Sequence, residues 1–374
     1  MMSRRSGVVV AVVAVAMCSA LLSGVSSAAG KEVAAGARGG VLSGSWGTAQ
    51  EVPGTAALNK GGNGGVNSVS CASAGNCGAA GSYTDGSGHF LAFVVTEKNG
   101  SWGTAEKVPG VVNRGGTVAI NSVSCGSPGN CSASGSYIAL TGASPAFVVN
   151  QTNGVWGTSE KLPGRLNLGR GAGISSVSCA TAGNCSAGGF YAGSSGHPQA
   201  FAVTEKNGVW GTAKEVPGTA ALNNGGNADV SSVSCRSPGN CSAVGSYTDS
   251  SGHFQAFVAG QKNGVWGTAK EIPGTAALNR GGDADVTSVS CTSPGNCSAG
   301  GSYTDGSGRH QVFLVTETNG AWGSAEEVPG SAALNKGGSA EILSVSCAPA
   351  GNCSAGGDYY DASHHLQAFA VSQT

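Results

Sequence analysis

The sequence predicts an all-β protein, and three observations carry this prediction. One unit repeats six times at a spacing of 54 or 56 residues, a length typical of propellers, solenoids and arrays. Each unit contains short strand-forming runs separated by turn residues. Residue size increases along each unit. The repeat is marked by every tryptophan of the chain: Trp46, Trp102, Trp156, Trp210, Trp266 and Trp322.

One unit illustrates the predicted strands. Residues 66–71, 77–83, 90–97 and 101–108 are short runs with the composition of β-strands. Gly75-Asn76 between the first two runs is a residue pair typical of a tight turn. Asn99-Gly100 between the last two predicts a two-residue type I′ hairpin. Each unit is therefore expected to be a four-stranded antiparallel meander.

The order of small and large residues predicts how these sheets are arranged. The first two strands of a unit consist mostly of Ser, Gly, Ala and Val, whereas the fourth carries the tryptophan. Sheets that radiate from an axis crowd at the centre and diverge outward, so their outer strands need bulky residues. The third strand carries a phenylalanine in every unit: Phe93, Phe147, Phe201, Phe257, Phe313 and Phe369.

The two ends of the repeat region predict how the ring closes. The chain enters the repeats at a fourth strand, residues 45–52, and ends just after a third strand, residues 368–374. The N-terminal strand can therefore complete the last unit, which leaves no exposed blade edge. We expect a six-bladed β-propeller over residues 45–374, with a closing blade shared by the N- and C-termini.

The first 29 residues have the features of a signal peptide. Arg4 and Arg5 precede an apolar stretch at 8–22, and small residues follow at 26–29. A lipid anchor on Cys18 is an alternative, although Met17 is large for the residue before such a cysteine. A twin-arginine signal is another, although Ser6 and Gly7 stand where apolar residues are expected. Residues 30–44 are rich in Gly and Ala and are expected to be a linker.

Composition restricts the partners. Charged residues make up 10% of the chain and the net charge is −1, which argues against nucleic acid because phosphate binding needs a basic surface. No stretch after the leader is long and apolar enough to span a bilayer. We expect a secreted, extracellular monomer.

Twelve cysteines remain after the leader, and they form six Cys-x5-Cys pairs. An even number in a secreted chain favours disulfides. The alternative is zinc, which usually needs four ligands and a shorter spacing. Each pair flanks the turn between the first two strands, so a disulfide within each blade is expected. The predicted bridges are Cys71–Cys77, Cys125–Cys131, Cys179–Cys185, Cys235–Cys241, Cys291–Cys297 and Cys347–Cys353.

The repeat resembles secreted bacterial propeller repeats of the form Val-Ser-Cys-x5-Cys-x-Ala-x-Gly followed by a tryptophan strand. The resemblance covers residues 45–374 and implies architecture, since propellers carry many unrelated activities. The hairpin at Lys98-Asn99-Gly100-Ser101-Trp102 also has a faint likeness to the sialidase Asp-box, but it lacks the Asp and the Gly spacing of that motif. No sialidase catalytic residue is carried over.

Two long connections in each unit, after the second and fourth strands, are expected on one face, where a ligand would bind. Five of the connections after the fourth strand carry a basic residue, and Asn224 takes this place in another. These residues are candidates for holding an anionic or hydroxyl-rich ligand, or they serve solubility alone. They are Lys60, Arg114, Arg170, Arg280 and Lys336.

Asp229, Asp285 and Glu341 precede the first strand in three adjacent units, where Gly65, Ala119 and Gly173 stand in the others. Because that strand is innermost, the acids are expected at the rim of the channel. They are candidate ligands for calcium on the axis, or solvated loop acids. Recurring histidines open the third strand in four units, too far from the axis to share one metal. No other cofactor is indicated.

No nucleophile elbow, zinc-protease motif or phosphate loop occurs in the chain. The leading hypothesis is therefore a non-catalytic binding or scaffold propeller that recognises a cell-surface glycan, polymer or protein. The alternative is a secreted hydrolase or lyase acting on a glycan or peptide, with Asp229, Asp285 or Glu341 as acid or base. The sequence favours the first without deciding whether the protein is an enzyme.

Overall fold

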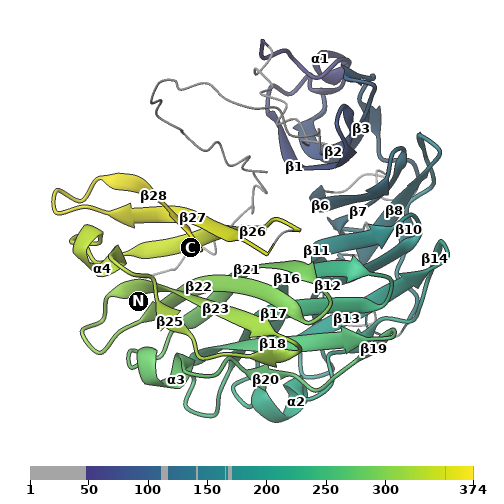
Figure 1. Cartoon of the computed structure of the whole chain (residues 1–374). Helices are drawn as coiled ribbons and strands as arrows, with labels where there is room; N and C mark the ends of the chain where they lie inside the picture. The colour runs from purple at the N-terminus through teal and green to yellow at the C-terminus, as the bar shows by residue number, and fades with distance from the viewer. Residues whose placement is uncertain are drawn as a thin grey trace, which may run out of the picture.

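The computed structural model describes residues 48–110, 117–139, 142–164, 166, 171–349 and 351–373. They form six antiparallel sheets arranged around an axis, which confirms the predicted six-bladed β-propeller (Figure 1). In each blade the first strand is innermost, and from blade 1 to blade 5 it packs against the first strand of the next blade. No helix within these residues is long and apolar enough to cross a membrane.

The strands follow the repeat. Blade 1 contains β1 (Gly64–Ser73), β2 (Asn76–Thr84), β3 (Phe90–Lys98), β4 (Ser101–Trp102) and β5 (Glu106–Lys107). Blade 2 contains β6 (Val118–Ser127), β7 (Asn130–Tyr137), β8 (Ala146–Thr152), β9 (Val155–Trp156) and β10 (Glu160–Lys161). Blade 3 contains β11 (Ala172–Thr181), β12 (Asn184–Ala192), β13 (Pro198–Lys206), β14 (Val209–Trp210) and β15 (Lys214–Glu215).

The second half of the ring repeats this order. Blade 4 contains β16 (Ala228–Ser237), β17 (Asn240–Thr248), β18 (Phe254–Lys262), β19 (Val265–Trp266) and β20 (Lys270–Glu271). Blade 5 contains β21 (Ala284–Ser293), β22 (Asn296–Thr304), β23 (His310–Thr318), β24 (Ala321–Trp322) and β25 (Glu326–Glu327). Blade 6 contains β26 (Ala340–Cys347), β27 (Cys353–Tyr360) and β28 (Leu366–Ser372).

The outermost strand is interrupted, which the sequence did not predict. In blade 1 the expected strand 101–108 is split into β4 and β5, and both pair with β3. Between them the backbone N–H of Ala105 donates to the carbonyl of Pro53 at 2.7 Å. The corresponding N–H of Ser159 donates to Pro109 of the preceding connection in the same way. The interruption therefore lets each outer strand donate a hydrogen bond to the connection that precedes its blade, while it still pairs with the third strand of its own blade.

Four of the connections that lead from one blade to the next contain a single helical turn. The helices are α1 (Thr55–Leu58), α2 (Thr219–Leu222), α3 (Thr275–Leu278) and α4 (Ser331–Leu334). A buried asparagine fixes each of the last three. Asn335, for example, donates from Nδ2 to the carbonyl of His310 at 2.7 Å and accepts from the N–H of Gly338 at 3.1 Å. These connections are ordered parts of the scaffold.

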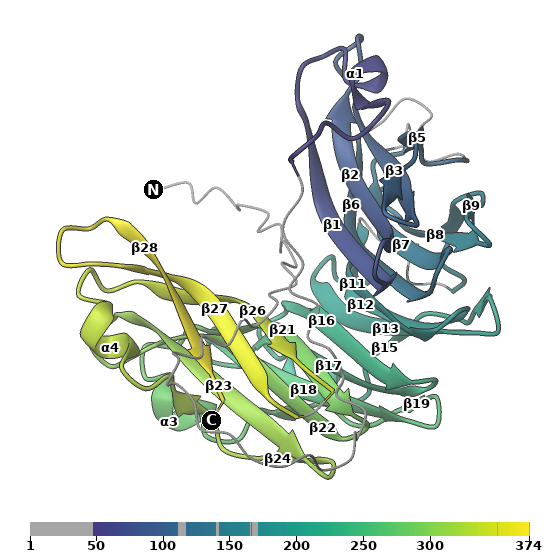
Figure 2. The same cartoon turned by 45° about the horizontal axis from the view of Figure 1, so that its top comes forward.

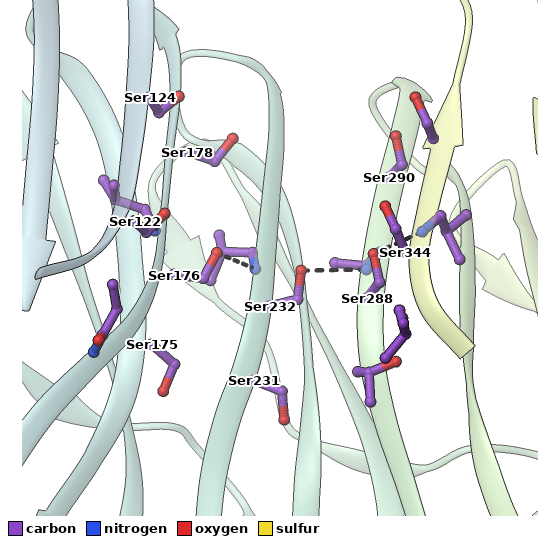
Figure 3. Close-up of a pocket in the computed structure, with 18 of the residues that line it drawn as sticks. Ser122, Ser124, Ser175, Ser176, Ser178, Ser231, Ser232, Ser288, Ser290 and Ser344 are labelled. Carbon is purple, nitrogen blue, oxygen red and sulfur yellow. Dashed lines mark hydrogen bonds between the residues drawn. The ribbon is translucent and has the colours of Figure 1, made fainter. Parts of the chain in front are cut away.

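A ladder of serines joins the inner strands, and we name it the serine ladder. Ser68 Oγ accepts a hydrogen bond from the N–H of Val123 at 3.0 Å, and Ser70 Oγ accepts one from Cys125 at 3.0 Å. Figure 3 shows the equivalent hydrogen bonds that Ser176 and Ser232 accept from backbone N–H groups of the next blade. The same two bonds recur at every interface from blade 1 to blade 6, which explains the repeated Ser-Val-Ser-Cys.

The closing blade differs from the others. Blade 6 has three strands within the described residues, while residues 45–47 of the expected fourth strand lie outside them and 48–52 are not in a strand. Figure 2 shows β1 and β28 standing apart at the two ends of the arc. The blade shared by both termini therefore stays a prediction.

A cavity marks the place where that fourth strand is expected. It has a volume of about 600 Å³ and lies beside β28, with Thr316 and Val371 in its lining. In blades 2 and 3 the equivalent place holds a tryptophan. Trp156 Nε1 donates to Thr96 Oγ1 of the preceding blade at 3.2 Å, and Thr96 corresponds to Thr316 in the repeat. The cavity is thus located where Trp46 would bind.

Candidate functional site

The inner strands of all six blades enclose a central cavity of about 550 Å³. Serine side chains dominate its lining (Figure 3). In the serine ladder each Oγ accepts a hydrogen bond from the next blade, so the hydroxyl keeps its own hydrogen as a donor. The cavity therefore offers rows of hydroxyl groups on a rigid frame.

The long-loop end of the cavity is asymmetric. The second residue of each inner strand lies opposite a fixed position of the next strand, and these pairs differ between blades. In blades 1 and 2 they are Gly65 with Ser82 and Ala119 with Ser136. In the other four blades they are Gly173 with Phe190, Asp229 with Ser246, Asp285 with Ser302, and Glu341 with Asp358.

Asp229, Asp285 and Glu341 all line the cavity, as the sequence predicted for its rim, and we call them the acid wall. Ser246 donates to Asp229 Oδ1 at 3.0 Å. Asp285 Oδ1 is buried and has no hydrogen-bond partner within the described residues. Among the described residues, no lysine, arginine or histidine is part of the cavity lining. The acid wall therefore has no described basic side chain beside it in the cavity.

Burial and mutual repulsion change the protonation of the acid wall. Burial, followed by the charges of Asp229 and Glu341, raises the pKa of Asp285 to about 7. Burial also raises the pKa of Asp229. The pKa of Glu341 is raised by burial and by Asp358, and His310 opposes this shift. Near neutral pH, Asp285 can therefore either donate or accept a proton.

Phe190 is a lining residue that the sequence analysis missed. Its side chain is 39% exposed, which is unusual for a phenylalanine inside a repeat of small residues. Gly173 makes room for it, because a Cβ added there would lie 3.0 Å from Cε1 of Phe190. The sequence signal is a departure from the repeat in the second strand of blade 3, where Gly-Phe-Tyr replaces the Gly-Ser-Tyr of other blades. The same comparison would have found Asp358.

The three basic candidates that the structure describes do not line this cavity. Lys60, Arg280 and Lys336 are exposed and lie at the end of the helical turns, and none of the three lines the cavity. Arg280 Nε donates to the carbonyl of Ala277 in its own turn at 3.4 Å. Arg114 and Arg170 lie outside the described residues. A role for these residues in binding remains a prediction.

The metal candidates are not gathered around one point. Within the described chain, one group of three side chains has ligand atoms within 4.8 Å of one another, namely Cys71, Cys77 and Glu97. Two of these are joined by a disulfide and are poor metal ligands. The acid wall does not form such a group, so calcium on the axis remains a prediction.

The six disulfides have the pairing that the sequence predicts, one within each blade. Their Cα atoms are 3.9 to 4.1 Å apart, closer than the roughly 4.5–5.5 Å expected for opposed residues. A register shift follows the first cysteine in blades 1 to 5. The bridges therefore fasten the inner hairpins beside the serine ladder.

Three of the recurring histidines, His89, His253 and His365, are each paired with an aspartate of their own turn. His89 Nδ1 lies 3.2 Å from Asp85 Oδ2, and the N–H of His89 donates to Asp85 Oδ1. This backbone hydrogen bond lowers the pKa of Asp85 more than any other interaction. His253 and Asp249 are paired in the same way in blade 4.

Comparisons with known proteins give structural likeness alone. No family model and no curated protein sequence matches the chain. One similar solved structure is the Hadza microbial sialidase Hz136, with 10% identity, 81% of this chain covered and a TM-score of 0.43. The chain spans 64% of that sialidase's length.

Two other similar structures have sugars bound. One is the GH93 α-L-arabinofuranosidase of Fusarium graminearum with arabinobiose, at 12% identity, 81% of this chain, 92% of that chain and a TM-score of 0.42. The other is a variant of the Aleuria aurantia lectin with α-methyl-L-fucoside, at 12% identity, 82% of this chain, 94% of that chain and a TM-score of 0.41. At these scores the likeness carries no argument about the site.

Proposed function

We propose that this protein is a secreted, non-catalytic binding propeller that holds a glycan at the long-loop end of its central cavity. The observation that carries the proposal is the lining: serine hydroxyls, the acid wall and the exposed ring of Phe190 meet in one cavity. Sugars present many hydroxyl groups and apolar C–H faces, so they suit hydrogen-bonding groups beside an aromatic ring. The six disulfides support secretion, since such bridges persist in oxidising compartments.

A glycan array with the purified protein tests this proposal, and Phe190→Ala is the informative variant. Phe254→Ala is a matched control, because Phe254 is 40% exposed but does not line the cavity. We expect wild type and Phe254→Ala to retain the same glycan and Phe190→Ala to lose it. Equal retention by all three, or no retention on the array and on cell-wall fractions, would contradict the proposal.

We infer as a second candidate function a secreted hydrolase or lyase that acts on a glycan or peptide. The observation that favours it is the pKa of Asp285, about 7, beside the carboxyl groups of Asp229 and Glu341. An acid that exchanges its proton near neutral pH suits general acid catalysis. Activity screening of wild type against Asp285→Ala separates the functions. Turnover that Asp285→Ala abolishes, with glycan retention intact, would establish catalysis.

A further inference from the structure

We propose that the acid wall selects glycans that carry a cationic amine, such as glucosamine units, over neutral and anionic glycans. This inference rests on the proposed function, because it assigns a ligand class to the same cavity. It is argued from the charge of the acid wall and from a buried carboxylate oxygen that lacks a hydrogen-bond partner, neither of which the proposed function required.

The first observation is that the acid wall forms no ion pair within the described residues. The ion pairs within the described residues are His89–Asp85, His253–Asp249 and His365–Asp361, and all three lie in exposed turns. The acid wall takes part in none of them, and the one described basic group that acts on it is His310, whose charge favours ionised Glu341. A cation that enters the cavity would therefore meet carboxyl groups that no described ion pair engages, and it would favour their ionised form.

The second observation points to the ligand itself. Asp285 Oδ1 is buried, lines the cavity and accepts no hydrogen bond within the described residues. A buried acceptor without a partner is costly, and a ligand N–H or O–H would remove this cost. An ammonium group is the better donor here, because it also offsets the repulsion among the three carboxyl groups.

The neighbouring blade supplies the remaining contact. Phe190 of blade 3 lies next along the ring to Asp229 of blade 4, and both line the cavity. The face of an aromatic ring attracts cations as well as sugar C–H groups. Anionic sugars would meet the same carboxylates with repulsion. Together these contacts favour a ligand that combines positive charge with a sugar ring.

The direct experiment compares β-1,4-linked oligosaccharides of equal length built from glucosamine, N-acetylglucosamine or glucose. Isothermal titration calorimetry near neutral pH measures the affinity of the full secreted protein for each. We expect the glucosamine oligosaccharide to bind about tenfold more tightly than the other two, which corresponds to about 1.4 kcal/mol. This preference is expected to shrink as salt is added, since screening weakens charge pairs.

Variants assign the preference to the acid wall. Asp285→Asn is expected to remove the tenfold preference, so that the variant binds the three oligosaccharides with similar affinity. Glu106→Gln on the exposed surface of β5 is the matched control and is expected to behave like wild type. Where Asp285→Asn does not fold, Glu341→Gln is measured in its place. Proton release on binding is a further readout, because a nearby cation lowers the raised pKa of Asp285.

The outcomes separate this inference from the proposed function. Equal affinity for all three oligosaccharides, or a preference that survives both acid-wall substitutions, would overturn amine selection and leave glycan binding standing. Failure of all three to bind, with no hit on the glycan array, would overturn both. Binding by calcium alone with no sugar affinity would overturn this inference in favour of a metal site.

Discussion

The third strands of blades 5 and 6 are alike in sequence pattern but differ in their surroundings. In β23, which pairs with β24 and β25, Val312 and Phe313 are fully buried, and Val312 packs in one cluster with Ile342 of blade 6. In β28, Phe369 is only partly buried and Ala368 and Ala370 are exposed. Two things differ: within the described residues blade 6 lacks an outermost strand, and blade 1 stands apart from β28, whereas β26 of blade 6 packs against β23. The comparison teaches that the outermost strand and the next blade together bury the large residues of a blade.

The largest expected effect comes from removing the segment that would cover β28. We expect deletion of residues 44–54 to abolish cooperative unfolding or cause aggregation, because it leaves the edge of β28 exposed. Deletion of residues 31–41 in the linker is the matched control and is expected to be neutral. Thermal unfolding and light scattering measure both. A stable, soluble protein after the first deletion would refute closure of the ring by the N-terminus.

Two phenylalanine substitutions measure whether blade 6 is covered in solution. Phe313→Ala is expected to cost about 3–5 kcal/mol, as for other buried phenylalanines. Phe369→Ala is expected to cost as much if the N-terminal strand covers β28. Denaturant unfolding measures both values. A much smaller cost for Phe369→Ala would show that blade 6 stays open.

Removing the disulfide of blade 5 or of blade 6 is expected to have a smaller effect on stability. Replacing both cysteines of Cys291–Cys297 by serine is expected to cost roughly 2–2.5 kcal/mol, since the bridge closes a short loop in the unfolded chain. We expect the same loss for Cys347–Cys353. Peptide mapping without reductant checks the pairing in the wild type. Any bridge between different blades, or a free thiol, would contradict the assignment.

The smallest expected effect is a pH dependence of the unfolding free energy, caused by a buried glutamate in the third strand of blade 3. Glu205 of blade 3 is buried, which raises its pKa to about 6, while Gln373 takes this position in blade 6. Because the folded-state pKa is raised, the contribution of Glu205 to stability is fully present below its ordinary pKa of 4.5 and is lost as pH rises through about 6.

The loss from Glu205 should be roughly 2 kcal/mol at most. Glu205→Gln is expected to remove this pH dependence, whereas Glu106→Gln at an exposed position should leave it unchanged. Unfolding free energies measured across this pH range decide the matter. Parallel curves for wild type and Glu205→Gln would show that the burial of Glu205 has no such effect.

The sequence predicted what the repeat itself encodes. Blade number, strand order, the disulfide pairs and the place of Asp285 on the cavity rim follow from spacing and residue size. The serine ladder could not be predicted, since it depends on the register between Ser68 and Val123 in different blades. The break at Ala105 depends on a bond to the preceding connection. Phe190 was missed because the repeat was compared at the inner strand only.

The serine ladder has a consequence for how this protein can change through evolution. Each of its bonds joins one unit to the next, and all five interfaces from blade 1 to blade 6 use the same two positions. A tandem duplication of one unit would therefore add an interface that can form the same two hydrogen bonds. After the loss of one unit, the two units that become neighbours could form them as well. The hydrogen bonds between inner strands therefore do not by themselves set the number of units, because each added unit would repeat the same two bonds.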